Sequence, residues 1–399
     1  MIKNRLHLIS FDIPFPADYG GVMDVFYKVK ALHDAGIAVV LHCFQYRERT
    51  PQAELEKYCA EVHYYPRNIG PLSMLSPQPY IVRSRTAPAL LKNLLKDDAP
   101  IIFEGLHACA YIGEKRLKNR LKIVRMHNVE WEYYRNLNKL ESRIWKKIYF
   151  SIESKKLQSF ENQILKNADI ILTISPDDTA YFEESIEKRT SKDASAKQSK
   201  VVYIPPFHPN VAVETKIGTG DYVLFHGKLS VSDNEEAAIY LIKKVFARRD
   251  IPFVVAGKEP SVRLLELAKA HENVTIRPNP TDIDMVNLIQ NAQINILMSF
   301  QRAGMKLKLL NALYRGRHCV VNRHTVQNTG LESLCYVKNT SRDMRALVES
   351  LMNVQLSNKQ IADRKVILES DFSNKINAAK IVDLLSHWQA CLVLRHLGL

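Results

Sequence analysis

Short apolar runs of strand length alternate along the chain with longer segments whose apolar residues recur at helical spacing. The first run, residues 6–11, is followed by a turn rich in Pro, Asp and Gly and then by a helical pattern over residues 22–35. Short apolar runs bounded by turn residues are typical of buried strands, and a helical spacing is typical of an amphipathic helix. The alternation predicts an α/β fold whose parallel sheets are covered by helices on both faces.

This alternation occurs twice along the chain. In the first half we predict strands at residues 6–11, 37–44, 62–65, 100–104, 121–126, 169–175 and 201–204. In the second half we predict strands at residues 222–226, 253–256, 274–276, 294–298 and 319–321. Two doubly wound Rossmann-like domains in series account for this pattern. Because such folds bind ligands at the carboxyl ends of their strands, we expect the ligand in a cleft where the two sheets face each other.

A proline-rich segment separates the two halves. Pro205, Pro206 and Pro209 lie within five residues of one another, and such a segment continues neither a helix nor a central strand. We therefore predict three parts: an N-terminal Rossmann-like domain over residues 1–205, a C-terminal Rossmann-like domain over residues 206–375, and a terminal helix over residues 376–399 that packs back on the N-terminal domain.

The composition is that of a basic globular protein. The chain has 56 Lys and Arg against 42 Asp and Glu, a formal charge of +14, and 46% hydrophobic residues. This hydrophobic content excludes a disordered chain, and no apolar run reaches the ~18 residues of a membrane-spanning helix. The N-terminus lacks a secretory cleavage signal, and six scattered Cys favour neither a disulfide framework nor a zinc site. We expect a cytoplasmic protein, and the absence of a reading motif argues against a nucleic-acid partner.

Candidate binding residues of the first half follow predicted strands. Gly20 and Gly21 precede the first predicted helix, where glycine lets backbone N–H groups approach a phosphate at the helix N-terminus. A structural turn is the alternative. His127 follows the fifth strand and His107 follows the fourth. A histidine at this edge suits contact with a substrate hydroxyl or general-base catalysis, and a histidine bonded to neighbouring backbone is the alternative.

In the second half, glycine and lysine again coincide with predicted helix starts. Lys228 follows a strand end and a glycine, and Gly304 begins a helical pattern that carries Lys306 and Lys308 in its first turns. Free N–H groups and positive charges at a helix start fit a diphosphate, and solvated surface lysines are the alternative. The motif Asp282-Ile283-Asp284 superficially resembles a metal-binding pair, but its place after Thr281 favours helix capping. No metal site is therefore predicted.

Taken together, these residues resemble the retaining nucleotide-sugar glycosyltransferases of family 4, which have the GT-B fold. The resemblance extends from Ser10 to about Leu385 and depends on the order and spacing of short motifs. These motifs are residues 15–22, Met126-His127-Asn128-Val129-Glu130, residues 169–175, His226-Gly227-Lys228, residues 254–258, and residues 304–316 with the following Val320-Val321.

The resemblance implies that the N-terminal domain holds the acceptor and the C-terminal domain holds the sugar nucleotide. It implies that the catalytic residue, His127, faces the transferred sugar. Positive charges and helix N-termini would stabilise the leaving diphosphate, so neither a metal nor another cofactor is expected. The implied donor-binding residues are Gly20, Gly21, Lys228, Gly304, Lys306, Lys308 and Asn311, and the implied acceptor-binding residues are Glu104, His107 and Asn128.

The chain departs from the family pattern at two positions around the donor. The family usually carries two glutamates there, and this chain has neither, with Asn311 at one position and Ala303 near the other. The amide of Asn311 can bond a ribose hydroxyl but supplies no charge.

Three functions are weighed on these grounds. The first is a glycosyltransferase that moves a sugar from a nucleotide-diphosphate donor to a glycan or lipid-linked acceptor with retention, in polysaccharide or glycoconjugate biosynthesis. The second is a non-catalytic, glycosyltransferase-like binding subunit, which the missing glutamates motivate. The third is a sugar-nucleotide epimerase, because one fold can support several chemistries.

Much of the positive charge lies in one segment of the N-terminal half. Residues 114–166 contain 14 Lys and Arg against six Glu, and the aromatic residues of this helical segment include Trp131, Tyr133, Tyr134, Trp145, Tyr149 and Phe150. A basic, aromatic, helical segment suits peripheral contact with an anionic membrane at the inner face, where a lipid-linked acceptor would lie. A solvated helix with its aromatic residues turned inward is the alternative, and the sequence leaves both open.

Overall fold

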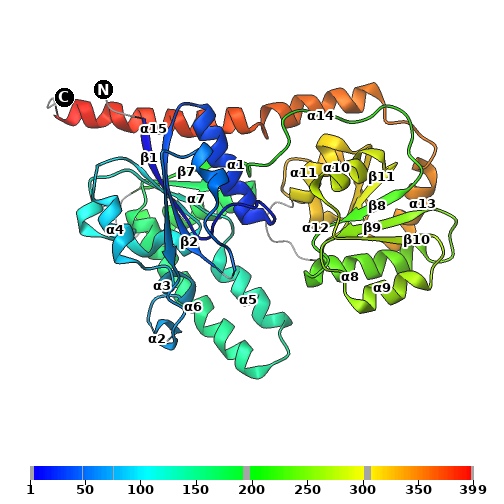
Figure 1. Cartoon of the computed structure of the whole chain (residues 1–399), viewed down its shortest axis with the longest axis horizontal. Coiled ribbons are helices and arrows are strands. Elements are labelled where there is room, and N and C mark those ends of the chain that lie inside the picture. The colour runs from blue at the N-terminus through cyan, green and yellow to red at the C-terminus, as the bar shows by residue number, and fades with distance from the viewer. Residues whose placement is uncertain (1–3, 47, 75, 192–197, 301–306, 397–399) are drawn as a thin grey trace. The chain divides into compact units, whose positions relative to one another are not determined.

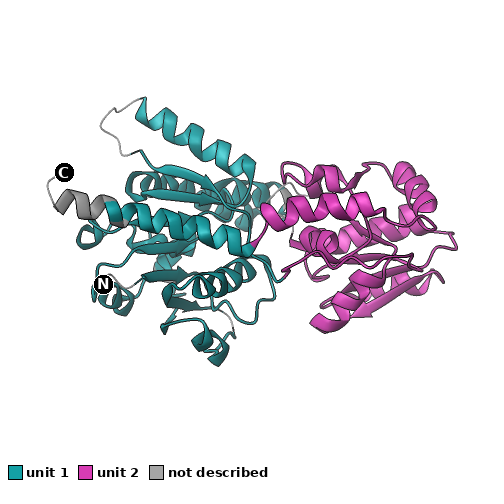
Figure 2. Ribbon diagram, turned by 90° about the horizontal axis from the view of Figure 1, so that it is seen from above, with its two compact units in different colours: residues 1–209, 374–399 teal, residues 210–373 magenta. Residues whose placement is uncertain are grey.

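Strands with nearly continuous apolar sequence form the centre of each half of the chain (Figure 1). The computed structural model describes residues 4–46, 48–74, 76–191, 198–300 and 307–396. The chain divides into two compact units, one of residues 1–209 with 374–399 and one of residues 210–373 (Figure 2). The predicted boundaries at residues 205 and 375 lie a few residues from these.

The first unit contains a seven-stranded parallel sheet in the order β3-β2-β1-β4-β5-β6-β7. Alternate residues of each strand face opposite sides, so Ile101 and Phe103 enter one apolar core while Ile102 enters the other. Both faces are therefore buried, as all-parallel sheets require. The strands are β1 (Arg5–Ser10), β2 (Ala38–Gln45), β3 (Glu61–Pro66), β4 (Ile101–Glu104), β5 (Lys122–Arg125), β6 (Ile170–Thr173) and β7 (Lys200–Tyr203).

The second unit contains a six-stranded parallel sheet in the order β10-β9-β8-β11-β12-β13. Its central strands β8 and β11 are buried along their whole length. The strands are β8 (Val223–His226), β9 (Phe253–Gly257), β10 (Val274–Pro278), β11 (Ile294–Leu297), β12 (His318–Val321) and β13 (Tyr336–Val337). The predicted α/β fold with two doubly wound sheets is confirmed, although β13 is too short for its sequence to show a pattern.

Helices cover both faces of each sheet. Those of the first unit are α1 (Gly20–Asp34), α2 (Pro71–Met74), α3 (Tyr80–Arg83), α4 (Pro88–Leu94), α5 (Glu130–Leu140), α6 (Ile144–Asn167), α7 (Pro176–Thr190) and α15 (Asn374–His396). Those of the second unit are α8 (Ser232–Tyr240), which continues as a π-helical turn over Leu241–Phe246, α9 (Val262–Lys269), α10 (Asp282–Asn291), α11 (Leu307–Arg315), α12 (Arg323–Val326), α13 (Ser341–Leu351) and α14 (Asn358–Ser370). Short 3₁₀ turns occur at Ala53–Lys57, Leu106–Tyr111, Lys115–Leu117 and Glu332–Leu334.

The start of α10 shows how a local motif fixes a helix boundary. The Thr281 hydroxyl accepts a hydrogen bond from the Asp284 backbone N–H (3.1 Å), and the Asp284 carboxylate accepts one from the Thr281 backbone N–H (3.2 Å). These reciprocal bonds form a capping box, which satisfies two of the free N–H groups at the helix start. The predicted capping role of this acidic pair is confirmed.

The C-terminal helix α15 belongs to the first unit. After α14 the chain leaves the second unit at residue 373, and α15 packs against α1. Ala378, Ile381 and Leu385 of α15 are buried in the same apolar core as Val25 and Val29 of α1. None of the described helices combines the length and the apolar character that crossing a bilayer requires.

A row of histidines crosses the first sheet. His7 Nδ1 of β1 lies 2.8 Å from His42 Nε2 of β2, and the Tyr65 hydroxyl lies 2.9 Å from His42 Nδ1. Burial lowers the pKa of His7 to about 4, although the charge of Asp97 opposes this shift. Burial, together with the neighbouring His7, holds the pKa of His42 well below its ordinary value. Both rings are therefore neutral in the folded protein at neutral pH.

We expect this row to make the first unit sensitive to acid. A histidine in the unfolded chain binds a proton near pH 6.5, whereas His7 and His42 resist protonation in the folded protein. The free energy of unfolding is therefore highest above pH ~6.5 and decreases as the pH falls toward 4. Each ring contributes at most about 1.4 kcal/mol per pH unit to this loss. Urea unfolding at a series of pH values should show a shallower acid dependence for His7→Gln. The matched control is His33→Gln, whose side chain is exposed; equal slopes for both variants would contradict the prediction.

Candidate functional site

Four charged side chains are buried where α1 crosses the carboxyl ends of β4 and β5. Asp24 and Lys28 lie one turn apart on α1, Glu104 ends β4 and Arg125 ends β5, and each is at most 1% exposed. The carboxyl ends of neighbouring parallel strands meet at one edge of a sheet, which is where ligands of such folds bind. We call these four residues the ion-pair network.

Each charge in the network faces an opposite charge. The Lys28 ammonium donates to Asp24 Oδ2 (3.0 Å) and to both oxygens of Glu104 (2.8 and 2.9 Å). Arg125 donates to Asp24 through Nε (3.1 Å) and Nη2 (3.0 Å). Buried charges are tolerated only when they are paired and hydrogen-bonded, and two cations here balance two anions.

Arg125 also connects the network to the end of the sheet. Its Nη1 donates to the backbone oxygens of Thr173 (3.1 Å) and Ile204 (2.6 Å). Asp24 Oδ1 in turn accepts from the backbone N–H of Phe207 (2.8 Å). The network therefore joins α1, β5, β6 and the segment that follows β7.

The network fixes both carboxylates in their charged form. Burial by itself would raise the pKa of Asp24, but the charges of Arg125 and Lys28 outweigh it and hold the pKa well below its ordinary value. For Glu104, burial is likewise outweighed by the charge of Lys28 and the hydrogen bond from His127, so its pKa is lowered. Both groups are hydrogen-bond acceptors only.

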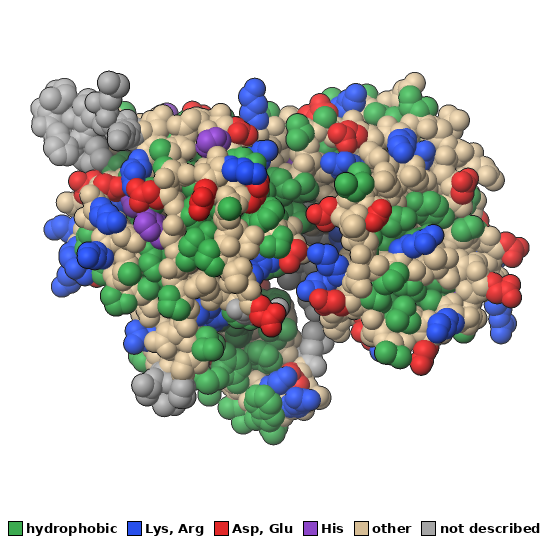
Figure 3. All heavy atoms as spheres, viewed as in Figure 1, with side chains coloured by type: hydrophobic (Ala, Val, Ile, Leu, Met, Phe, Trp, Pro, Cys, Tyr) green, Lys and Arg blue, Asp and Glu red, His purple; other side chains and the backbone are tan. Residues whose placement is uncertain are grey.

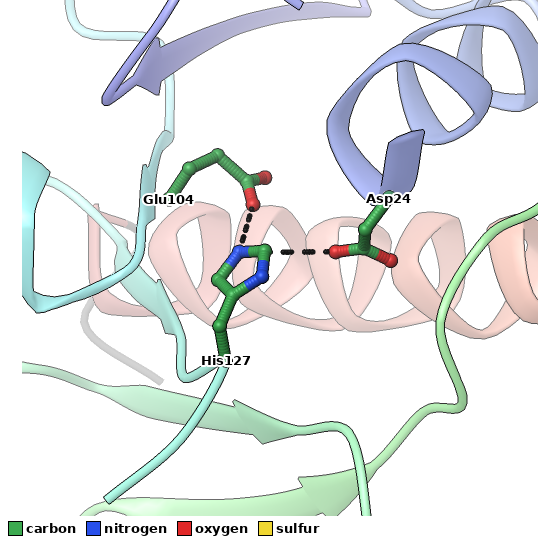
Figure 4. A group of neighbouring side chains, drawn as sticks. All are labelled: Asp24, Glu104 and His127. Carbon is green, nitrogen blue, oxygen red and sulfur yellow. Dashed lines mark hydrogen bonds and ion pairs between the residues drawn. The ribbon is translucent and has the colours of Figure 1, made fainter. Parts of the chain in front are cut away.

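His127 lies beside these two carboxylates, as Figure 4 shows. Its Nε2 is 3.2 Å from Glu104 Oε2 and 3.9 Å from Asp24 Oδ2. Because an ionised carboxylate can only accept, Nε2 carries the proton and donates to Glu104. In the neutral ring Nδ1 is then the acceptor nitrogen. The side chain is 12% exposed, whereas the network beneath it is closed to solvent.

Three potential metal ligands lie near one another: Asp24, Glu104 and His127. One ligand atom from each falls within 4.8 Å of the others. The Lys28 ammonium, however, already lies between the two carboxylates and bonds both. A divalent cation in that place would meet the charges of Lys28 and Arg125, so the geometry is that of an ion-pair network.

Gly105 lets two histidines approach the same backbone. Its φ of +68° is in the left-handed region that favours glycine. A Cβ there would lie 3.1 Å from His107 Nδ1 and 3.6 Å from His127 Cδ2. The ring of Phe11 lies 5.5 Å from both imidazoles. Burial and the charge of Arg85 hold the pKa of His107 well below its ordinary value, and its Nδ1 has no hydrogen-bond partner among the described residues.

Asn128 connects His127 to the start of α5. Its side chain hydrogen-bonds Glu130, the first residue of that helix. Burial raises the pKa of Glu130 to about 7, although this hydrogen bond opposes the shift. The carboxyl group of Glu130 therefore exchanges protons near neutral pH.

Gly20 and Gly21 are the first two residues of α1, so the helix begins two residues before the predicted start at residue 22. The helix is preceded by Tyr19, whose side chain makes no capping hydrogen bond. A Cβ at Gly21 would lie 2.7 Å from the Phe11 ring, so the glycine allows this ring to pack beside His127. The N-terminal N–H groups of α1 are of the kind that bind anions.

In the second unit, Asn234 connects two of the predicted lysines. Its Nδ2 donates to the Lys228 backbone oxygen (2.9 Å), and its Oδ1 accepts from the Lys308 ammonium (2.8 Å). Lys308 also lies 5.1 Å from the centre of the Phe225 ring. Burial, with the nearby charge of Lys308, lowers the pKa of His226 to about 3. Lys228 is 42% exposed and pairs with Glu259 at 3.7 Å.

Two glycines allow the strand ends beside Lys228 to approach closely. A Cβ at Gly257, at the end of β9, would lie 1.8 Å from the Gly227 backbone oxygen. Any larger residue at Gly257 would therefore displace the turn after β8 that carries Lys228.

Asn311, on α11, is held by the side-chain amide of Asn210. Its Oδ1 accepts from Asn210 Nδ2 (2.9 Å), and Asn210 Oδ1 accepts from Arg315 Nε (2.8 Å). The predicted donor residues Gly304 and Lys306, with Ala303, lie outside the described residues.

The structure thus forms two groups from the predicted residues. Gly21, His107 and His127 gather around Phe11 in the first unit. Glu104 is bonded to His127, and Asn128 follows His127 in the chain. Lys228 and Lys308 meet at Asn234 in the second unit, and Asn311 lies farther along α11. We predicted that Glu104 binds the acceptor, but its side chain is fully buried and both of its oxygens accept hydrogen bonds from Lys28.

Sequence reasoning missed four residues that organise these groups. Three of them are charged residues that interrupt the apolar pattern of a predicted helix or strand: Asp24, Lys28 and Arg125. This interruption was the only signal of their role in the sequence. Asn234 lies in a polar segment with no distinguishing signal.

Comparison with known proteins shows what the chain is similar to. Residues 220–353 match the family model described as glycosyl transferases group 1. This match lies within the second unit and shows what that unit is similar to. A Klebsiella pneumoniae protein described as an uncharacterized 44.6 kDa protein in the cps region is 28% identical over 331 residues, which are 77% of this chain and 80% of that protein.

Solved glycosyltransferase structures share the fold of the whole chain. Anabaena HepE, solved with UDP and glucose, is similar with a TM-score of 0.63 at 11% identity, over 96% of this chain and 99% of HepE. A Rickettsia africae glycosyltransferase is similar with a TM-score of 0.61 at 12% identity, over 98% and 99% of the two chains. The predicted GT-B fold and the resemblance to glycosyltransferases are confirmed.

We expect Lys28→Met to destabilise the first unit by about 3–5 kcal/mol, because it leaves a buried carboxylate without its cation. The double variant Lys28→Met with Glu104→Gln removes that uncompensated charge and should recover part of the loss. Lys30→Met on the same helix, where the side chain is only partly buried, is the matched control. Urea denaturation measures all three; a double variant no more stable than the single one would show that the ion pair is not the cause.

Proposed function

We propose that the protein is a glycosyltransferase that moves a sugar from a nucleotide-diphosphate donor to a glycan or lipid-linked acceptor in polysaccharide biosynthesis. The match of residues 220–353 to glycosyl transferases group 1 supports the reaction class. The relative from a cps region supports the biosynthetic role, and the likeness to HepE with UDP and glucose supports a nucleotide-sugar donor.

The observation that carries the proposal is the fixed orientation of His127. Glu104 holds Nε2–H, the ion-pair network holds Glu104, and Nδ1 is left as the acceptor nitrogen at a partly exposed position. An imidazole held in this way can accept a hydrogen bond from a sugar hydroxyl and orient the sugar for transfer. Glu104 acts through His127 as a positioning residue, and His107 and Asn128 face the acceptor side.

The donor diphosphate is held by cations and helix N-termini. In the transfer, the bond between the sugar C1 and the phosphate oxygen breaks, the acceptor hydroxyl oxygen forms the new bond to C1, and the hydroxyl proton is released to solvent. The nucleoside diphosphate leaves with an additional negative charge, which Lys228 and Lys308 of the second unit neutralise. These charges serve in place of a metal ion, and the reaction proceeds with retention in the cytoplasm. Asn311 contributes a neutral amide near the donor.

Binding of the donor can be tested with the full-length protein and a panel of sugar nucleotides. A ligand that binds the folded state raises its melting temperature, so at least one sugar nucleotide should do so, and a suitable acceptor should then yield a glycosylated product. The absence of stabilisation by every donor would overturn the proposal. Stabilisation without turnover would indicate a binding subunit, and an epimerised sugar without acceptor would indicate an epimerase.

We expect His127→Ala to lower turnover at least about tenfold, because a positioned hydrogen bond to the reacting sugar is lost. Circular dichroism and the melting temperature should stay near those of the wild type, since the side chain lies at the edge of the buried network. His63→Ala is the matched control, a partly exposed histidine of the same sheet that pairs with Glu61. Unchanged turnover for His127→Ala would assign that residue a structural role only.

A further inference from the structure

The helix α6 has apolar residues on two opposite faces. One face packs into the first unit through Leu157, Phe160 and Ile164, which are at most 3% exposed. The opposite face carries Ile144, Trp145, Ile148 and Ile152. We call these four residues the α6 patch.

The α6 patch is exposed along its whole length. Ile144 is 71% exposed, Trp145 62%, Ile148 56% and Ile152 50%. Positions four residues apart lie on the same helix face, so the three isoleucines form a line of about 12 Å. Single exposed apolar residues are ordinary, whereas a contiguous line of large ones marks an interaction surface.

The neighbouring helix does not cover this face. The first half of α6 packs against α5, where the rings of Tyr134 and Phe150 are 5.9 Å apart in an edge-to-face contact. Figure 1 shows α5 and α6 as a hairpin that projects from the body of the first unit. In the same view, Figure 3 shows hydrophobic side chains beside Lys and Arg on this projection. A projecting surface can meet a broad, flat partner.

The charges around the patch identify that partner. Residues 130–156 contain seven Lys and Arg and four Glu. Two of these glutamates, Glu130 and Glu153, are buried, and Glu141 already pairs with Lys146. Lys155 is exposed on the same face, one turn beyond the end of the patch. The solvent-facing charge of the hairpin is therefore positive.

We propose that the α6 patch docks the first unit on an anionic lipid bilayer surface. An apolar helix face with Trp and Ile, bordered by Lys and Arg, enters the interface between headgroups and acyl chains while the cations meet anionic headgroups. The patch thus gives the unit that we assign to the acceptor a direct route to a lipid-linked substrate. The docking itself does not depend on that assignment, because it requires neither donor nor acceptor.

Vesicle flotation of the full-length protein tests the proposal. The protein should float with vesicles of equal parts phosphatidylcholine and phosphatidylglycerol at low salt and remain unbound with phosphatidylcholine alone. High salt should weaken the binding, because exposed charges are screened. Failure to float with the anionic vesicles at low salt would overturn the proposal.

A double variant separates the patch from the general charge of the protein. We expect Ile148→Gln with Ile152→Gln to lower the vesicle partition coefficient at least about tenfold, because apolar burial drives insertion. The matched control is Ile283→Gln with Val366→Gln in the second unit, which are 75% and 71% exposed. Equal partitioning of the two double variants would overturn the proposal.

Tryptophan fluorescence provides an independent measurement. Anionic vesicles should shift the emission to shorter wavelengths, and Trp145→Phe should abolish the shift while vesicle binding persists. Analytical ultracentrifugation without vesicles tests the competing occupant: a dimer that Ile148→Gln with Ile152→Gln converts to monomer would assign the patch to a second copy of the chain. Donor hydrolysis in solution, measured on the same variants, should be unchanged, so loss of docking is distinguishable from loss of activity.

Discussion

The geometry of the first unit depends on two buried cations that balance two buried carboxylates. Lys28 bridges Asp24 and Glu104, and Arg125 holds Asp24 while it donates to the backbone beyond the sheet. Such an arrangement is stable only as a complete set, since a charge left alone in the interior has no solvent to stabilise it. The orientation of His127 follows from this requirement, because the oxygen that accepts its proton already belongs to the set.

In the second unit, neutral groups position charged side chains. Asn234 positions Lys228 and Lys308 through its amide, and Gly257 lets the adjoining strand ends approach. An amide fixes an ammonium without cancelling its charge. The first unit therefore confines balanced charge beneath a histidine, whereas the second retains positive charge near a helix start.

Strand positions were predictable because each sheet is buried on both faces. A continuous apolar run such as residues 101–103 is typical of a strand whose two faces are both buried. The helix starts near Gly20 and Thr281 could also be predicted from nearby residues, because glycine and capping side chains act within a few residues. The strand of residues 336–337 was missed, since two residues carry no periodicity. The network of Asp24, Lys28 and Arg125 was missed because its partners are about eighty to a hundred residues apart.

The sequence alone determined the alternation of strands and helices, the two doubly wound sheets and the motif positions of His127, Lys228 and Lys308. Local spacing and turn chemistry suffice for those features. Only the tertiary structure decided that Glu104 is a buried partner of Lys28 and that Ile144 lies on the exposed face of α6. The physical reason is that burial and pairing depend on residues distant in sequence, whose approach no local pattern encodes.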